Sequence, residues 1–187
     1  MEFREPFEAG ECYHVYNHAV GSDNIFRCDE NYNFFLNKYQ EYLSDTWDTL
    51  AWCLMPNHFH LLVRIKGPPE QISSDALTKK ISAQYSHFTN SYAQAYNKYW
   101  NRRGALFMHR FKRKRITDEI YLKQAICYIH KNPVNHGFRN SPDEWEFSSY
   151  NEILQHTHLP ENKEIIRLFE NRKNFILSHS SSVDIEL

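Results

Sequence analysis

Residues 48–65 of this chain read Asp-Thr-Leu-Ala-Trp-Cys-Leu-Met-Pro-Asn-His-Phe-His-Leu-Leu-Val-Arg-Ile. Two largely apolar runs, 48–54 and 58–65, flank the short segment Met55-Pro56-Asn57. Two strand-length segments separated by a turn that contains Pro and Asn are typical of an antiparallel hairpin. We therefore predict that these runs form two neighbouring strands.

The segments on either side of this hairpin predict two more strands and two helices. Residues 12–17 are rich in aromatic and β-branched residues and are expected to form a strand. A helix should follow at 29–44, with Asp29 as its N-cap. After the hairpin, apolar residues at helical spacing predict a helix over 75–97, and a fourth strand is expected near 111–116.

The last predicted element of this group is a helix from Asp118 to Asn132, which should end there because a residue before Pro disfavours helical backbone. The order strand, helix, two strands, helix, strand, helix indicates an α+β fold of ferredoxin-like type, an antiparallel sheet with two helices on one face. The additional helix would be free to lie on the other face. We expect a domain over 1–150 and a helical tail over 151–187 with one further helix after Glu161.

The composition indicates a globular protein without a membrane segment. The chain has 187 residues, of which 41% are hydrophobic, enough for a core in one domain. It contains no apolar run of about 18 residues and no apolar stretch near the N-terminus that resembles a signal peptide. The four cysteines are widely spaced and form no CxxC motif, which favours free thiols in the cytoplasm.

Basic residues are concentrated in one segment, although the formal net charge is only −1. Residues 98–115 contain 8 of the 22 Lys and Arg residues and no acid, with aromatic residues interleaved. Such a pattern suits neutralisation of phosphates and stacking of bases in single-stranded DNA, although charged runs are also common on ordinary solvated surfaces. The candidate DNA contacts are Arg102, Arg103, Arg110, Lys112, Arg113, Lys114 and Arg115.

His58 and His60 form the candidate metal site. Side chains alternate between the two faces of a strand, so Phe59 and Leu61 should pack in the core while both histidines point together to the other face. Neutral imidazole is a common ligand of divalent metals. The chain has 11 histidines, so one such pair by chance is also unsurprising.

Several separated motifs resemble one family. The stretch Leu54-Met55-Pro56-Asn57-His58-Phe59-His60-Leu61-Leu62 is similar to the signature of the HUH nucleases, and Pro-Asn before the first His is typical of their single-tyrosine transposase branch. The stretches 128–137, beginning Tyr-Ile-His-Lys-Asn-Pro, and 145–150, Trp-Glu-Phe-Ser-Ser-Tyr, resemble later signatures of that branch. The resemblance spans roughly residues 12–150 and is closest to the transposases associated with repetitive extragenic palindromes (REP).

This resemblance implies a set of functional residues and a chemistry. Tyr128 matches the nucleophile and Asn132 the third metal ligand, beside His58 and His60. The expected substrate is single-stranded or hairpin DNA, cleaved and rejoined through a 5′-phosphotyrosine with Mg²⁺ or Mn²⁺. From the residues alone Tyr121, on the same helical stripe, competes with Tyr128. The resemblance leaves open whether the protein acts as a monomer or a homodimer.

Two other functions fit parts of the sequence. A domesticated, non-catalytic relative would bind DNA hairpins with the same surface. A metal-dependent hydrolase of a small substrate would need another ligand near the histidine pair, for which His14 and Asp48 are the candidates. The presence of all three metal positions and of the tyrosine favours the transposase interpretation.

Overall fold

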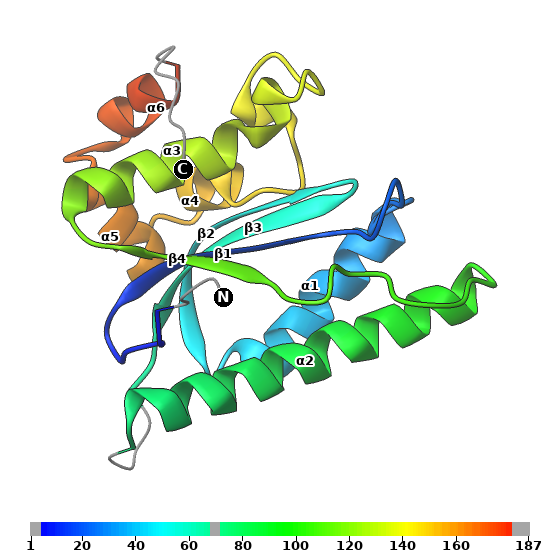
Figure 1. Ribbon diagram of the computed structural model, residues 1–187. Helices are drawn as coiled ribbons and strands as arrows, with labels where there is room; N and C mark the ends of the chain where they lie inside the picture. Colours follow the sequence, from blue (N-terminus) through cyan, green and yellow to red (C-terminus); the bar gives the residue numbers. More distant parts are fainter. Residues whose placement is uncertain (1–4, 68–71, 181–187) are drawn as a thin grey trace.

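The computed structural model describes residues 5–67 and 72–180 and confirms the predicted layout (Figure 1). The elements predicted from the sequence are β1 (Cys12–His18), α1 (Asp29–Leu43), β2 (Trp47–Met55), β3 (His58–Ile65), α2 (Ser74–Tyr99), β4 (Lys112–Ile116) and α3 (Glu119–Asn135). A 3₁₀ turn, η1 (Pro142–Glu144), and three helices, α4 (Tyr150–Gln155), α5 (Pro160–Leu168) and α6 (Arg172–Ser180), complete the chain.

The four strands form one antiparallel sheet in the order β2-β3-β1-β4. This is the ferredoxin-like arrangement, with the first strand between the third and the fourth. β1 pairs with β3 so that Tyr16 lies opposite His60 and His18 opposite His58. On its other side β1 pairs with β4, where His14 lies opposite Lys114. The register therefore brings residues of three strands together on one face.

Helices α1 and α2 cover one face of the sheet and enclose an aromatic core (Figure 1). Phe59 and Leu61 of β3 are buried, and the ring of Phe59 lies 5.1 Å from that of Phe35 in α1. Phe35 in turn meets Phe88 of α2 edge-on at 4.8 Å. The alternation predicted for β3 is thus confirmed, and the histidines lie on the opposite face.

That opposite face is covered by α3, which packs on β2 and β3 (Figure 1). The side chain of Asp118 caps the helix by accepting from the Tyr121 N–H at 2.8 Å. The expected end at Asn132 is wrong, since α3 continues to Asn135 with Pro133 inside it. Pro133 is buried, so its apolar packing helps to offset the missing proline N–H, and its carbonyl accepts from the Phe138 N–H at 2.8 Å.

Two smaller expectations are also corrected. The N-cap of α1 is Cys28, which makes no side-chain capping bond, and Asp29 is instead the first helical residue, where a carboxylate favours the helix dipole. The C-terminal tail contains two helices after residue 159, α5 and α6, which bury Ile165 and Phe175 respectively. The division at residue 150 remains a prediction. No helix within the described ranges is long and apolar enough to cross a membrane.

Candidate active site

A cavity of about 460 Å³ lies beside β1, β3 and α3 on the sheet face opposite the aromatic core. Its lining contains a cluster of histidines together with Tyr16 and Tyr128. The cluster consists of His14, His18, His58, His60 and His136. Alternation along β1 puts His14 and His18 on the same face as the histidines of β3. The sheet register thus collects imidazoles from two strands in one cleft.

Nε2 of His58 and Oδ1 of Asn132 face each other, and each has a lone pair directed toward the other residue. Nδ1 of His58 lies 2.8 Å from Oδ1 of Asn57, which can only accept, so the ring proton sits on Nδ1 and leaves a lone pair on Nε2. Nδ2 of Asn132 donates to the Tyr128 carbonyl at 2.9 Å, which turns Oδ1 toward His58. Nε2 of His58 and Oδ1 of Asn132 are 3.5 Å apart and buried. Two facing acceptors at this distance suit a divalent cation that both could reach.

His60 supplies the second imidazole beside this pair. Its ring centre lies 5.1 Å from that of His58, and its Nδ1 is 2.8 Å from Nε2 of His14. Burial lowers the pKa of His58 to about 4 and the pKa of His60 well below its usual value, so both rings are neutral at pH 7. Within residues 5–67 and 72–180, no three His, Cys, Asp or Glu side chains form a metal-binding group. The groups that could hold a metal ion here are the two imidazoles and the carboxamide of Asn132.

Tyr128 projects from α3 into the same cleft. Its ring meets His60 edge-on with centres 5.5 Å apart and His14 edge-on at 6.0 Å. The side chain is half-buried, and burial raises the pKa of the phenol above its usual value of about 10. The hydroxyl is therefore protonated at pH 7, and attack by its oxygen requires that the proton be removed and the target be made electrophilic.

Tyr121 is placed differently, although it lies on the same stripe of α3. It is absent from the lining of the cleft. Its hydroxyl oxygen is buried and has no hydrogen-bond partner among the residues described. Its ring lies 5.2 Å from Nζ of Lys114. A buried hydroxyl outside the cleft is poorly placed to meet a DNA phosphate, so this geometry favours Tyr128.

A chain of hydrogen bonds fixes α3 to β2 and α6. Nδ1 of His179 lies 2.7 Å from the Phe175 carbonyl and must donate to it, so Nε2 of His179 accepts from Nδ1 of His130 at 2.9 Å. Nε2 of His130 then accepts from Oγ of Ser149 at 2.8 Å. Oγ of Ser149 accepts from the Trp52 N–H at 2.9 Å. His130 is fully buried between the positions of the candidate nucleophile and the candidate amide ligand, so this chain helps to hold both in place.

Comparisons with known proteins agree with the motifs and the fold. No family model matches the chain. A Haemophilus influenzae protein named "Putative REP-associated tyrosine transposase" is 25% identical over 135 residues, covering 68% of this chain and 75% of that protein. A solved structure described as a REP-associated tyrosine transposase bound to a REP hairpin matches with a TM-score of 0.61 and 19% identity, over 87% of this chain and 90% of that one. The resemblance to the REP-associated tyrosine transposases is confirmed.

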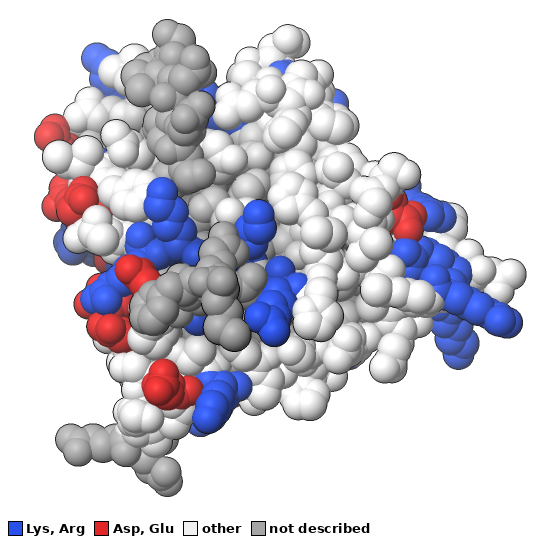
Figure 2. Space-filling model, viewed as in Figure 1, with Lys and Arg blue, Asp and Glu red and all other residues white. Residues whose placement is uncertain are grey.

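The basic residues of β4 divide between the two faces of the sheet. Strand alternation puts Lys112 and Lys114 on the same face as the cleft, opposite Tyr16 and His14 of β1, and both are exposed. Nζ of Lys112 lies 5.9 Å from the centre of the Tyr16 ring, which lines the cleft. Figure 2 shows basic side chains over the region of β4 and a second group beside the C-terminal end of α2.

Arg113 and Arg115 point to the other face. The guanidinium of Arg113 lies 4.4 Å from the ring centre of Phe7 and donates to the Glu5 carbonyl at 2.9 Å. Arg115 forms ion pairs with Glu8 and Glu11, both at 3.1 Å. The structure therefore separates these two arginines from the cleft and pairs them with the N-terminal segment.

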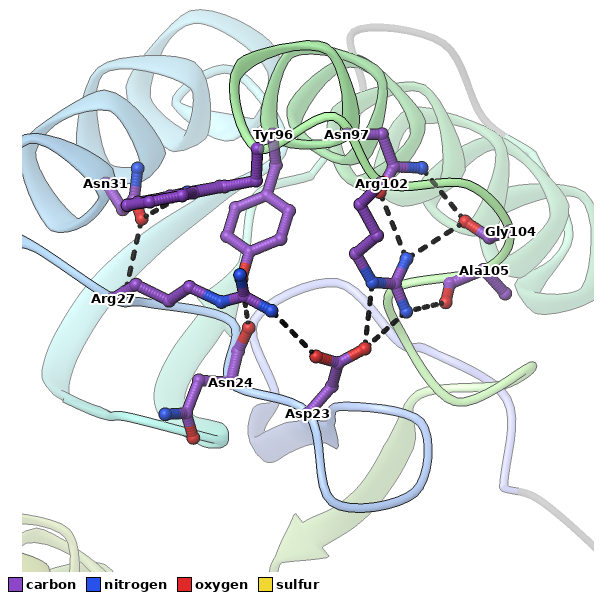
Figure 3. A network of polar contacts seen from close by, with 10 residues as sticks. Asp23, Asn24, Arg27, Asn31, Tyr96, Asn97, Arg102, Gly104 and Ala105 are labelled. Atoms are coloured by element: carbon purple, nitrogen blue, oxygen red, sulfur yellow. Dashed lines mark hydrogen bonds and ion pairs between the residues drawn. The ribbon is translucent and has the colours of Figure 1, made fainter.

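Arg102 belongs to a polar network that joins the end of α2 to the loop before α1 (Figure 3). Its guanidinium pairs with Asp23 and donates to Oδ1 of Asn97 at 3.0 Å and to the Ala105 carbonyl at 2.8 Å. Asp23 also pairs with Arg27 at 3.1 Å. Most of the Arg102 donors are thus engaged within the protein. The remaining candidates, Arg103 and Arg110, are exposed.

Two histidines of the cleft were missed in the sequence, and one candidate ligand lies elsewhere. The ring of His18 stacks on His58 with centres 4.9 Å apart, and His136 meets it edge-on at 5.1 Å. Alternation from His14 could have found His18, whereas His136 lies beyond the predicted end of α3. Asp48 pairs with Lys66 at 3.2 Å, at the opposite end of the hairpin from His58, and supplies no ligand to the cleft.

Proposed function

We propose that this protein is a DNA strand transferase that cleaves and rejoins single-stranded or hairpin DNA through a 5′-phosphotyrosine on Tyr128. The observation that supports it best is that the ring of Tyr128 and the imidazoles of His58 and His60 line one cleft, with the amide oxygen of Asn132 3.5 Å from Nε2 of His58. The relative and the solved structure named above carry the description of tyrosine transposases, and the solved one is bound to a REP hairpin.

Mg²⁺ or Mn²⁺ is the cofactor we propose, held by His58, His60 and Asn132. Such an ion would polarise the phosphate and offset the charge that develops on it. The donor set is neutral, since no carboxylate is among the described residues that line the cleft, so the ion would keep its positive charge for the phosphate. Oδ1 of Asn57 orients the ring of His58 by contact with Nδ1 of that ring. The side-chain amide of Asn132 is bonded to the backbone carbonyl of Tyr128.

In the proposed reaction the phenolic oxygen of Tyr128 attacks the phosphorus, and the bond from phosphorus to the 3′-oxygen breaks. The tyrosine proton leaves to solvent, and the departing 3′-oxygen takes up a proton to become a 3′-hydroxyl. The new ester keeps the downstream strand attached through its 5′-phosphate. Attack of a 3′-hydroxyl on that ester reverses the step, which is how strands would be rejoined.

The active site is formed within one chain in this proposal. Tyr128 and His60 of the same chain are already in ring contact, so no partner subunit is needed to complete the cleft. Mixing a Tyr128→Phe variant with a His58→Ala variant should then restore no cleavage. Restored cleavage in the mixture would show that subunits exchange active-site residues.

The function is tested by trapping the covalent intermediate. Labelled hairpin and single-stranded DNA incubated with the protein and Mn²⁺ should give a denaturant-resistant adduct that carries the downstream segment. Tyr128→Phe should abolish the adduct, whereas the matched control Tyr121→Phe should keep it, because that hydroxyl is outside the cleft. Hairpin binding without cleavage or adduct in the parent protein would favour the non-catalytic relative, and cleavage without adduct would favour a hydrolase.

A further inference from the structure

His14 is one of three histidines of the cleft, with His18 and His136, for which the proposed reaction has no use. It lies on β1, is 3% exposed, and its Nε2 is 2.8 Å from Nδ1 of His60. Its ring also stacks on that of Tyr16 with centres 4.9 Å apart. A group in contact with one ring nitrogen of a histidine can orient that histidine as a metal ligand through its other ring nitrogen.

Only one proton can lie between these two rings. His14 and His60 are 3% and 4% exposed, and no carboxylate is among the described residues that line the cleft, so each ring is neutral and carries one N–H. Lys114, opposite His14 across the sheet, adds a positive charge that disfavours a second one on the His14 ring. Either His60 donates from Nδ1 to Nε2 of His14, or His14 donates from Nε2 to Nδ1 of His60.

The two arrangements differ in whether Nε2 of His60 carries a lone pair or a proton. If His60 donates from Nδ1, its Nε2 has a free lone pair and can bind a metal. If His60 accepts at Nδ1, its own proton must sit on Nε2, and that nitrogen cannot act as a ligand. His58 shows the first arrangement, because Oδ1 of Asn57 can only accept from its Nδ1.

We infer that His14 is a positioning residue that accepts the Nδ1 proton of His60 and so keeps the Nε2 lone pair of His60 available for a divalent cation. This inference rests on the metal site of the proposed function and extends it to a residue that binds neither metal nor DNA. The Pro-Asn-His turn and the first strand would then supply one acceptor each, Asn57 for His58 and His14 for His60.

Two variants test separately the contribution of the acceptor nitrogen of His14 and the contribution of its aromatic ring. His14→Phe keeps an aromatic ring beside Tyr16 and removes the acceptor. His14→Gln removes the ring but can place its Oε1 near the position of Nε2. If the inference is right, Mn²⁺ affinity falls on the order of 10–100-fold in His14→Phe, the range typical for loss of a group that orients a metal ligand, and is largely restored in His14→Gln. Circular dichroism and thermal unfolding check that both variants are folded.

The tautomer of His60 is read directly in the metal-free protein. Long-range ¹H–¹⁵N NMR of histidine-labelled protein, assigned with His60→Gln, should show the proton of His60 on Nδ1 in the parent and in His14→Gln, and on Nε2 in a large fraction of His14→Phe. A proton on Nε2 in the parent would overturn the inference, as would unchanged Mn²⁺ affinity in His14→Phe. Because the NMR measurement needs neither metal nor DNA, its result is independent of whether the parent protein proves to be a transferase.

Discussion

Lys114 and Arg115 are neighbours in the chain, yet their side chains lie on opposite faces of the sheet. Lys114 is exposed on the face of the cleft, with Nζ 5.2 Å from the ring centre of Tyr121. Arg115 turns to the other face and pairs with Glu8 and Glu11. The basic residues of β4 therefore belong to two different surfaces, and the surface with Lys114 adjoins the candidate active site.

Neutralising the lysines of β4 should weaken DNA binding more than neutralising its arginines. The double variant Lys112→Gln/Lys114→Gln should reduce hairpin affinity and lower the slope of log K against log salt by about 2, one for each phosphate contact. The matched variant Arg113→Gln/Arg115→Gln removes the same charge from the other face and should leave the slope close to that of the parent. Fluorescence anisotropy at several salt concentrations measures both, and equal slopes for the two variants would contradict the assignment.

Asn132 should contribute to metal binding through its oxygen. Asn132→Asp keeps an oxygen at that position and adds a negative charge, so Mn²⁺ affinity should be retained or increased. Asn132→Leu removes the oxygen and should weaken Mn²⁺ binding on the order of 10–100-fold, comparable to the loss of a group that supports a metal site. Isothermal titration calorimetry of the two variants decides, and a Leu variant that binds Mn²⁺ like the parent would remove Asn132 from the site.

Arg102 should stabilise the fold rather than bind DNA. Its guanidinium makes charge-assisted bonds to Asp23 and to two backbone carbonyls (Figure 3), and the bonds to Asp23 are partly shielded from water. Arg102→Gln should lower the free energy of unfolding by about 2 kcal/mol, as expected for hydrogen bonds to a charged group. Arg103→Gln, which removes an exposed arginine at the next position, is the control and should leave stability unchanged. Urea unfolding that fails to distinguish the two variants would count against this role.

His179 should make the fold sensitive to acid. Burial lowers the pKa of His179 to about 4 in the folded protein, against about 6.5 in an unfolded chain. Between these values the unfolded state binds the extra proton, so this contribution to stability is complete above about pH 6.5 and is lost as the pH falls toward 4.

The expected slope from this one histidine is roughly 1 kcal/mol per pH unit within that window. His179→Gln should make the dependence of unfolding free energy on pH shallower by about one proton between pH 6 and 4.5. Urea unfolding at several pH values measures the slope, and an identical slope in the parent and the variant would show that His179 titrates normally. The variant also removes the contact with His130, so a lower adduct yield at pH 7.5 would indicate that α6 helps to place Tyr128.

The sequence was most informative where a repeating pattern forces the geometry. Alternation along β3 correctly separated Phe59 from His58 and His60, because one set of side chains had to fill the core beneath the sheet. The family motifs led to Tyr128 rather than Tyr121, a choice that helical spacing alone left open. Which of these two hydroxyls lies at the cleft depends on how α3 packs on β2 and β3. The spacing of residues along a single helix gives no information about that packing.

The features that were missed depend on contacts between distant segments. The local rule for proline considers the lost N–H of Pro133 but not the burial of this residue among distant segments, which helps to offset that loss in α3. The bond between His14 and His60 depends on the pairing of β1 with β3. The division of the basic segment could have been predicted, since alternation along 112–115 already assigns its four residues to two faces.

The register of β3 also links the chemistry of the cleft to the stability of the core. A slip by one residue against β1 and β2 would put Phe59 and Leu61 into the cleft and turn both imidazoles toward the aromatic layer formed with α1 and α2. Each polar ring buried there without a partner would cost roughly 1–3 kcal/mol, in addition to the lost apolar packing. The slipped register is therefore less stable than the native one, so the hydrophobic core determines the face of the sheet on which both histidines lie.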